Sequence, residues 1–274
     1  HGADRYGTGG GERPGRGESG GVPGDSGAVA TDAKGRLRAV DALRGVTIIS
    51  MVLFHWCYDL RYLSGIPLSF FQPPLQDVWR ATISWTFLFI AGWMCSHSRS
   101  STRRAARYLF VALLIYLSTS LARVDAPIRF GIIFCMGAST LVAGFALRAG
   151  LLDGSWWQTV ALLVLFVMLL RLPEGTLGVG ALALRLPRAL YDTPYLSWLG
   201  FPGPRFVSGD YYPLLPFGLM YLVGANVGVM LARHTLPTWV FECGLGPLAL
   251  IGRHPLLIYL LHQPLLLVLA SQVH

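Results

Sequence analysis

One apolar stretch of the chain carries ionisable side chains at helical spacing. Residues 39–60 read AVDALRGVTIISMVLFHWCYDL, a run long enough to cross a bilayer as a helix. Because a helix turns about 100° per residue, the eleven-residue step from Arg44 to His55 leaves these side chains within about 20° of each other. Asp41 and Asp59 lie on the same face. Ionisable groups are costly in lipid, so this stripe predicts a functional site that faces the interior of a helix bundle.

His55 is the leading candidate for a catalytic residue. An imidazole accepts and returns a proton near neutral pH, because its unperturbed pKa is about 6.5. Asp59 follows at the i+4 position of the predicted helix, so it is a candidate to orient the His55 ring and stabilise its charged form. The alternative is that His55 is a packed histidine whose hydrogen bonds are satisfied within the bundle.

Arg44 and Asp41 lie near the start of the same predicted helix. The planar fork of an arginine suits phosphate oxygens, so Arg44, with Asp41 beside it, is a candidate to bind a phosphate-bearing cofactor. Two other roles fit the spacing equally well. Arg44 could anchor the helix by reaching to the membrane surface, or it could pair with Asp41 one turn away.

A second group of candidates lies in the last apolar run, residues 255–270. His262 is a second candidate catalytic histidine, and Gln263 beside it is a candidate for binding the substrate. Pro264 can kink the helix and so bring His262 towards His55. The alternative for His262 is a hydrogen bond that serves only helix packing.

Three further candidates border predicted spans. Arg253 and His254 precede the last span and could contact a cofactor phosphate, although a flanking cytoplasmic position also accounts for them. Asp210 precedes the run DYYPLLP at the outer membrane edge and is a candidate for binding a polar substrate. It could instead cap the helix that follows, since an Asp at a helix start accepts backbone N–H bonds.

The composition predicts an all-α integral membrane protein. Of the 274 residues, 53% are hydrophobic and only 13% are charged, where soluble domains carry about 25%. The net charge of +8 does not indicate nucleic-acid binding, because the arginines flank apolar spans rather than a soluble basic domain. The cysteines, Cys57, Cys95, Cys135 and Cys243, form no C-x-x-C or Cys/His pattern, so we expect no disulfide framework and no metal site.

The chain divides into a Gly-rich arm, residues 1–35, and a membrane domain, residues 36–274. The arm cannot bury enough apolar surface to fold, so we expect it to be disordered. Lys34, Arg36 and Arg38 precede the first span and place the N-terminus in the cytoplasm. In the longest loop, residues 178–186 could form a short helix in the membrane interface. We predict a bundle of about seven spans, near residues 37–60, 78–96, 108–122, 129–147, 156–172, 211–231 and 255–270.

Three blocks of sequence together resemble one family. They are RAVDALRGVTIISMVLFHWCYDL with FLFIAGW after it, DYYPLLPFGLMYLVGANVG, and IGRHPLLIYLLHQP. The combination resembles the bacterial branch of the heparan-alpha-glucosaminide N-acetyltransferase catalytic-domain family, over roughly residues 36–270. The spacing of Arg44 and His55 is also similar to the R-x10-H signature of the wider membrane acyltransferase group. One motif departs from the family, because Phe134 in GIIFCMG stands where the family often has a histidine.

The resemblance implies a transmembrane acetyl transfer. Family members take an acetyl group from acetyl-CoA on the cytoplasmic side and give it to an amino or hydroxyl group of a sugar or glycan beyond the membrane. His55 would match the family's catalytic histidine. The implied location is the bacterial inner membrane, among lipids, and the sequence also allows a homodimer.

Two other classes of function remain open from the sequence. A transporter or flippase could use the same His, Asp and Arg stripe as a proton relay without being an enzyme. The chain could also be a fragment that packs with other subunits and has no activity of its own.

Overall fold

The computed structural model describes residues 38–98, 100–122, 126–234 and 246–272. The predicted disordered arm and Cys243 lie outside these residues. The described chain is a helical bundle with one small hairpin, which confirms the all-α prediction. Within the described ranges, four helices are long and apolar enough to cross a membrane, or five if one bent pair counts as a span. The total of seven spans and the cytoplasmic N-terminus stay predictions.

The helices follow the predicted spans closely. Their bounds are α1 Arg38–Tyr62, α2 Leu75–Ser96, α3 Ser101–Leu121, α4 Ile132–Arg148, α5 Trp156–Leu169, α6 Leu214–Ala232, α8 Gly246–Arg253 and α9 Pro255–Ala270. The largest difference is at α3, which begins at Ser101 where the predicted span began near residue 108, so its first two turns include Arg103, Arg104 and Arg107. Ser100 begins this helix by accepting a hydrogen bond from the Arg103 backbone N–H. The helix α8 was not predicted.

The centre of the bundle is built on close backbone contacts between α2 and α6. A Cβ atom at Gly92 would collide with the carbonyl oxygen of Tyr221, and one at Gly224 would collide with that of Phe89. Small residues permit this approach, which is a common basis of helix packing in membranes. The Tyr221 hydroxyl lies 2.7 Å from the Thr140 hydroxyl of α4, so α4 packs on the same pair.

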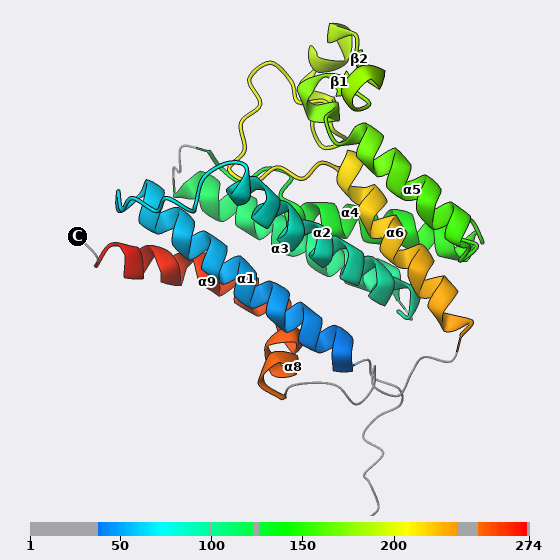
Figure 1. The fold of residues 1–274 in the computed structure, drawn as a ribbon, viewed down its shortest axis with the longest axis horizontal. Coiled ribbons are helices and arrows are strands. Elements are labelled where there is room, and N and C mark those ends of the chain that lie inside the picture. The colour runs from blue at the N-terminus through cyan, green and yellow to red at the C-terminus, as the bar shows by residue number, and fades with distance from the viewer. Residues whose placement is uncertain (1–37, 99, 123–125, 235–245, 273–274) are drawn as a thin grey trace, which may run out of the picture. The chain divides into compact units, whose positions relative to one another are not determined.

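The helix α5 lies beside α6 and exposes most of its surface (Figure 1). Phe166 is its only fully buried residue, as expected for a lipid-facing helix. Asn226 of α6 fixes the start of α5, because its Oδ1 accepts from the Gly154 N–H at 2.8 Å. Its Nδ2 donates to the Ser155 carbonyl and the Thr159 hydroxyl, each at 3.0 Å.

A second group of helices is formed by α1, α8 and α9. Figure 1 shows α9 beside α1. The helix α8 leaves the direction of α9 at a bend of 87°. Glycines again allow the contact: a Cβ atom at Gly45 would collide with the Leu248 carbonyl, and one at Gly252 with the Asp41 carbonyl. The first half of α1 is therefore held against α8 and its second half against α9.

The segment between α5 and α6 contains the hairpin. The strands β1 (Thr176–Leu177) and β2 (Leu184–Arg185) pair antiparallel, with a 3-10 turn at Gly180–Leu182 between them. The predicted interfacial helix at residues 178–186 is therefore wrong. Gly178 and Gly180 have φ angles of 94° and 59°, which a right-handed helix excludes. Further 3-10 turns lie at Leu172–Glu174, Arg188–Tyr191 and Pro194–Leu196.

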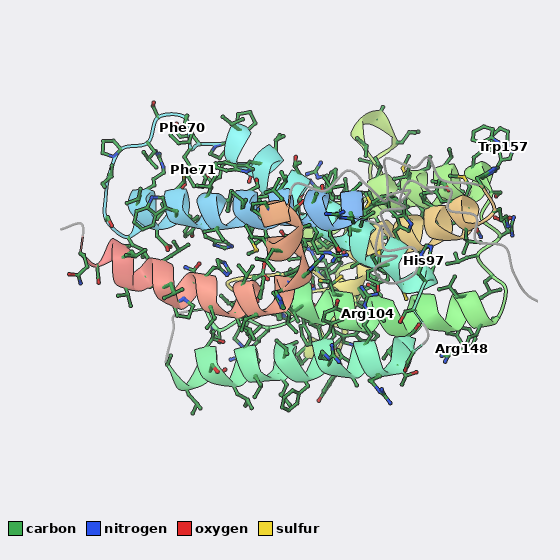
Figure 2. The ribbon with its side chains drawn as sticks, turned by 90° about the horizontal axis from the view of Figure 1, so that it is seen from below. Phe70, Phe71, His97, Arg104, Arg148 and Trp157 are labelled. Carbon is green, nitrogen blue, oxygen red and sulfur yellow. The ribbon has the colours of Figure 1, made fainter. Side chains whose placement is uncertain are left out.

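The bundle has two ends, which we call the Arg44 end and the Asp210 end. Arg44 lies in the early part of α1, against α8. Asp210 lies before α6 and contacts the start of α4. In Figure 2, His97 and Arg148 lie towards one end of the bundle, while Phe70 and Phe71 lie towards the other. His97 and Arg148 lie at the C-terminal ends of α2 and α4, which are at the Arg44 end. Phe70 and Phe71 precede α2 at the Asp210 end.

Candidate functional site

The rings of His55 and His262 face each other between α1 and α9. Their centroids are 4.9 Å apart and their planes are inclined at 58°. The two rings meet because α9 runs parallel to α1. Near the start of α1, Arg44 contacts Gly252, which shortly precedes α9. Beyond the end of α1, Ser64 donates to the carbonyl of Ala270, the last residue of α9. The helix α9 continues through Pro264 to Ala270. The structure thus brings together the two histidines that the sequence singled out.

His262 is held in one tautomer by the backbone. Its Nδ1 lies 2.7 Å from the carbonyl oxygen of Tyr259. A carbonyl oxygen can only accept a hydrogen bond, so Nδ1 carries the proton and Nε2 of the neutral ring has a lone pair. This Nε2 is buried and has no hydrogen-bond partner among the described residues. Its lone pair is therefore oriented by the protein and ready to accept a proton.

Asp59 is bonded to α9 rather than to His55. The Gln263 Nε2 lies 3.3 Å from both carboxylate oxygens of Asp59, which is a buried residue. Within the described ranges, no hydrogen bond joins Asp59 to His55, so the predicted orienting contact is not formed. Instead, the carboxylate accepts hydrogen bonds from the Gln263 amide of the facing helix α9. The sequence of α1 alone gives no indication of this partner.

Arg44 joins α1 to the end of α8. Its Nη1 donates to Oδ1 of Asp41 and to the carbonyl oxygen of Gly252, each at 3.0 Å. The pairing with Asp41 was one of the roles open from the sequence. The second contact is new: the carbonyl groups at a helix C-terminus lack intrahelical partners and carry partial negative charge, which an arginine complements.

Arg253 and His254 occupy the bend between α8 and α9. Both side chains are exposed. The two residues are the next ones in the chain after Gly252, which Arg44 contacts. The structure therefore gathers all four candidate cofactor-binding residues, Asp41, Arg44, Arg253 and His254, at one end of the bundle. The His55 and His262 pair lies further along the same two helices.

Asp210 caps a different helix from the one that the sequence suggested. Its Oδ2 accepts a hydrogen bond from the Ile132 N–H, the first residue of α4, at 3.0 Å. The following helix α6 begins at Leu214, and no side chain caps it at the N-cap residue Pro213, so the alternative that Asp210 caps α6 is wrong. Burial raises the pKa of the Asp210 carboxyl, although the Ile132 N–H, Arg80 and the Tyr259 hydroxyl all favour its charged form.

Tyr259 is a site residue that the sequence gave no reason to choose. Its carbonyl oxygen holds His262, and its hydroxyl interacts with Asp210. Tyr259 also packs against two apolar clusters, the one centred on α2, α4 and α6 and the one between α1 and α2. A tyrosine in an apolar span carries no local signal of such a role, because each of these contacts is made with another element or through the backbone.

Comparison with known proteins decides the family. The family model described as heparan-alpha-glucosaminide N-acetyltransferase, catalytic, matches residues 36–264. This chain belongs to that family. No curated protein and no solved structure matches it. Membership identifies the chain as a membrane acetyltransferase, and the family uses acetyl-CoA as the acetyl donor. In the part of the chain that the structure describes, no group of three or more His, Cys, Asp or Glu is arranged to hold a metal ion.

Proposed function

We propose that the protein transfers an acetyl group from acetyl-CoA to an amino or hydroxyl group of a sugar or glycan, with His55 and His262 at the reaction centre. The observation that carries the proposal is the pairing of the two imidazoles, 4.9 Å apart, inside a membrane acetyltransferase. The donor enters from the cytoplasm and the acceptor from the opposite side, in the bacterial inner membrane.

The coenzyme binds at the Arg44 end in this proposal. Arg253 and His254 are exposed there and can contact the phosphates of acetyl-CoA. Arg44, paired with Asp41, supports them by donating to the Gly252 carbonyl near the end of α8. Placed in this way, the coenzyme directs its thioester along α1 towards His55.

The chemistry requires a base and a stabilised oxyanion. The acceptor nitrogen or oxygen attacks the thioester carbon, its proton passes to an imidazole, and the C–S bond breaks to release the CoA thiolate, which regains the proton. His55 serves as this base, or it first attacks the thioester itself and carries the acetyl group as acyl-histidine. His262 assists by taking the proton at Nε2 or by stabilising the oxyanion when protonated. Asp59 and Gln263 hold the facing helices in register.

Turnover of radiolabelled acetyl-CoA by the purified protein tests the proposal. His55→Ala should abolish transfer and leave folding intact, whereas His234→Ala, at an exposed histidine beyond α6, should behave as the wild type. Equal turnover by the wild type and His55→Ala would disprove the role of His55. A folded wild type that does not bind acetyl-CoA would favour a different donor or a transport function.

A further inference from the structure

A cavity of about 860 Å³ lies at the Asp210 end of the bundle, separate from the cofactor-binding candidates. Its walls come from the second half of α3, from residues 128–134 at the start of α4, and from the segment between residues 192 and 206. Tyr259 of α9 lies on its inner side. The volume falls within the range of about 300–1,000 Å³ that is usual for sites that bind small molecules.

The part of the cavity between α3 and α4 is apolar. Leu109, Ala112 and Leu113 of α3 face Ile133 and Phe134 of α4 there. Along α3, the lining from Leu109 to Tyr116 extends about 10 Å. Leu113 is 51% exposed, and α3 is a candidate membrane span that buries little of its surface. This side of the cavity is therefore open to the hydrocarbon of the bilayer and is suited to an alkyl chain.

The mouth of the cavity is cationic. Arg129 and Arg205 line it together with one carboxylate, Asp192. Neither guanidinium has a carboxylate oxygen within 4.0 Å in the described part of the chain. Arg129 lies over the Tyr116 ring at 5.9 Å, and Ser208 fixes its backbone by accepting from its N–H at 2.9 Å and donating to its carbonyl at 2.7 Å. The guanidinium groups of Arg129 and Arg205 suit a phosphate.

The inner wall of the cavity leads to the reaction centre. Tyr259 lines the cavity, and its hydroxyl interacts with Asp210. The carbonyl oxygen of the same residue holds His262, one helical turn further along α9. A molecule in this cavity would therefore approach the two histidines from the end of the bundle opposite the cofactor-binding candidates.

We propose that this cavity binds the acceptor, and that the acceptor is a lipid-linked sugar phosphate rather than a free sugar. The alkyl chain lies between α3 and α4, the phosphate is bound by Arg129 and Arg205, and the sugar extends towards Tyr259. This substrate class rests on the proposed acetyl transfer, but the binding site itself can be tested without any turnover.

The test measures binding to the protein in phosphatidylcholine nanodiscs, without acetyl-CoA. The probe is farnesyl phosphate, compared with farnesol, which lacks the charge, and glucose 1-phosphate, which lacks the chain. Farnesyl phosphate should bind about tenfold or more tightly than either. The double variant Arg129→Gln with Arg205→Gln should lose about 30-fold in affinity, because about 1 kcal/mol for each of the two cations beside a lipid phosphate sums to about 2 kcal/mol. Arg185→Gln, an exposed arginine of β2 outside the cavity, should bind as the wild type does.

Several results would overturn the proposal. They are equal binding of farnesol, equal binding of glucose 1-phosphate, unchanged affinity in the double variant, and displacement of the probe by an equal amount of phosphatidylglycerol. All of these are independent of catalysis. Failure of acetyl transfer with intact farnesyl phosphate binding would instead reject the proposed function and leave the lipid-phosphate site standing.

Discussion

The imidazole rings of His55 and His262 lie 4.9 Å apart, although the residues come from opposite ends of the described chain. Within the described residues, only one of the two has a hydrogen bond that fixes its tautomer, the bond from His262 Nδ1 to the Tyr259 carbonyl. The two rings therefore have different environments, because the backbone orients the Nε2 lone pair of His262 and no such bond orients His55 within the described residues.

We expect the two histidines to act as one unit. His55→Ala and His262→Ala should each lower kcat by about 10²–10⁴-fold, the usual range for removal of an acid-base group. The double variant should be no worse than the poorer single variant, because groups that act together are not additive. Steady-state kinetics of all three proteins test this. Multiplied losses would show that the histidines act independently.

The bond between Asp59 and Gln263 should stabilise the fold. Gln263→Leu leaves the Asp59 carboxylate buried without its amide donor and should reduce the free energy of unfolding by about 1–3 kcal/mol. Adding Asp59→Leu should recover most of the loss, because removing both partners avoids an unsatisfied buried group. Thermal unfolding in detergent provides the measurement.

The same pair of variants tests the catalytic role of Asp59. Retained turnover in the stable double variant would show that Asp59 only holds α1 against α9. Lost turnover in a stable double variant, together with retained turnover in Gln263→Leu alone, would instead show that Asp59 is needed for the reaction, as its place on α1 one turn from His55 suggests.

The contact between α1 and α8 should tolerate no side chain at Gly252. Gly252→Ala forces a Cβ atom into the Asp41 carbonyl, so we expect a destabilisation of about 1–3 kcal/mol, typical of overpacking. Gly246→Ala is a matched control in the same helix, because no described residue lies within 4 Å of its Cβ position. It should change stability by no more than about 0.5 kcal/mol. Equal unfolding temperatures for the two variants would contradict this packing.

Stability should fall with rising pH because of Asp210. Burial raises the pKa of its carboxyl in the folded protein, so the folded state retains this proton at a pH where the unfolded chain has released it. The resulting stability is fully present below the unfolded pKa and is lost as the pH rises through the folded pKa. Asp210→Asn removes this dependence and retains an oxygen for the Ile132 N–H.

Unfolding temperatures measured between about pH 4 and pH 7 check the role of Asp210. The wild type should lose stability relative to Asp210→Asn across this range. Asp192→Asn, at an exposed carboxyl, should follow the wild type in parallel. A constant difference between the wild type and Asp210→Asn would show that the pKa of the Asp210 carboxyl is the same in the folded and unfolded states and would contradict the prediction.

The sequence by itself determined the helical membrane class and the stripe on α1. Both are local properties: apolar runs of sufficient length become helices in lipid, and the helical repeat places Asp41, Arg44, His55 and Asp59 on one face. The three sequence blocks also indicated the family, which the match over residues 36–264 shows. The predicted interfacial helix at residues 178–186 is wrong because Gly178 and Gly180 adopt positive φ angles.

Only the tertiary structure decided which partners these residues have. His262 lies beside His55, Asp59 is bonded to Gln263, Arg44 holds the end of α8, and Asp210 caps α4 instead of α6. Each partner is distant in sequence, and two of the contacts use backbone groups at helix ends. Local periodicity fixes the direction in which a side chain points, but the facing group depends on how glycine contacts and the 87° bend arrange the helices.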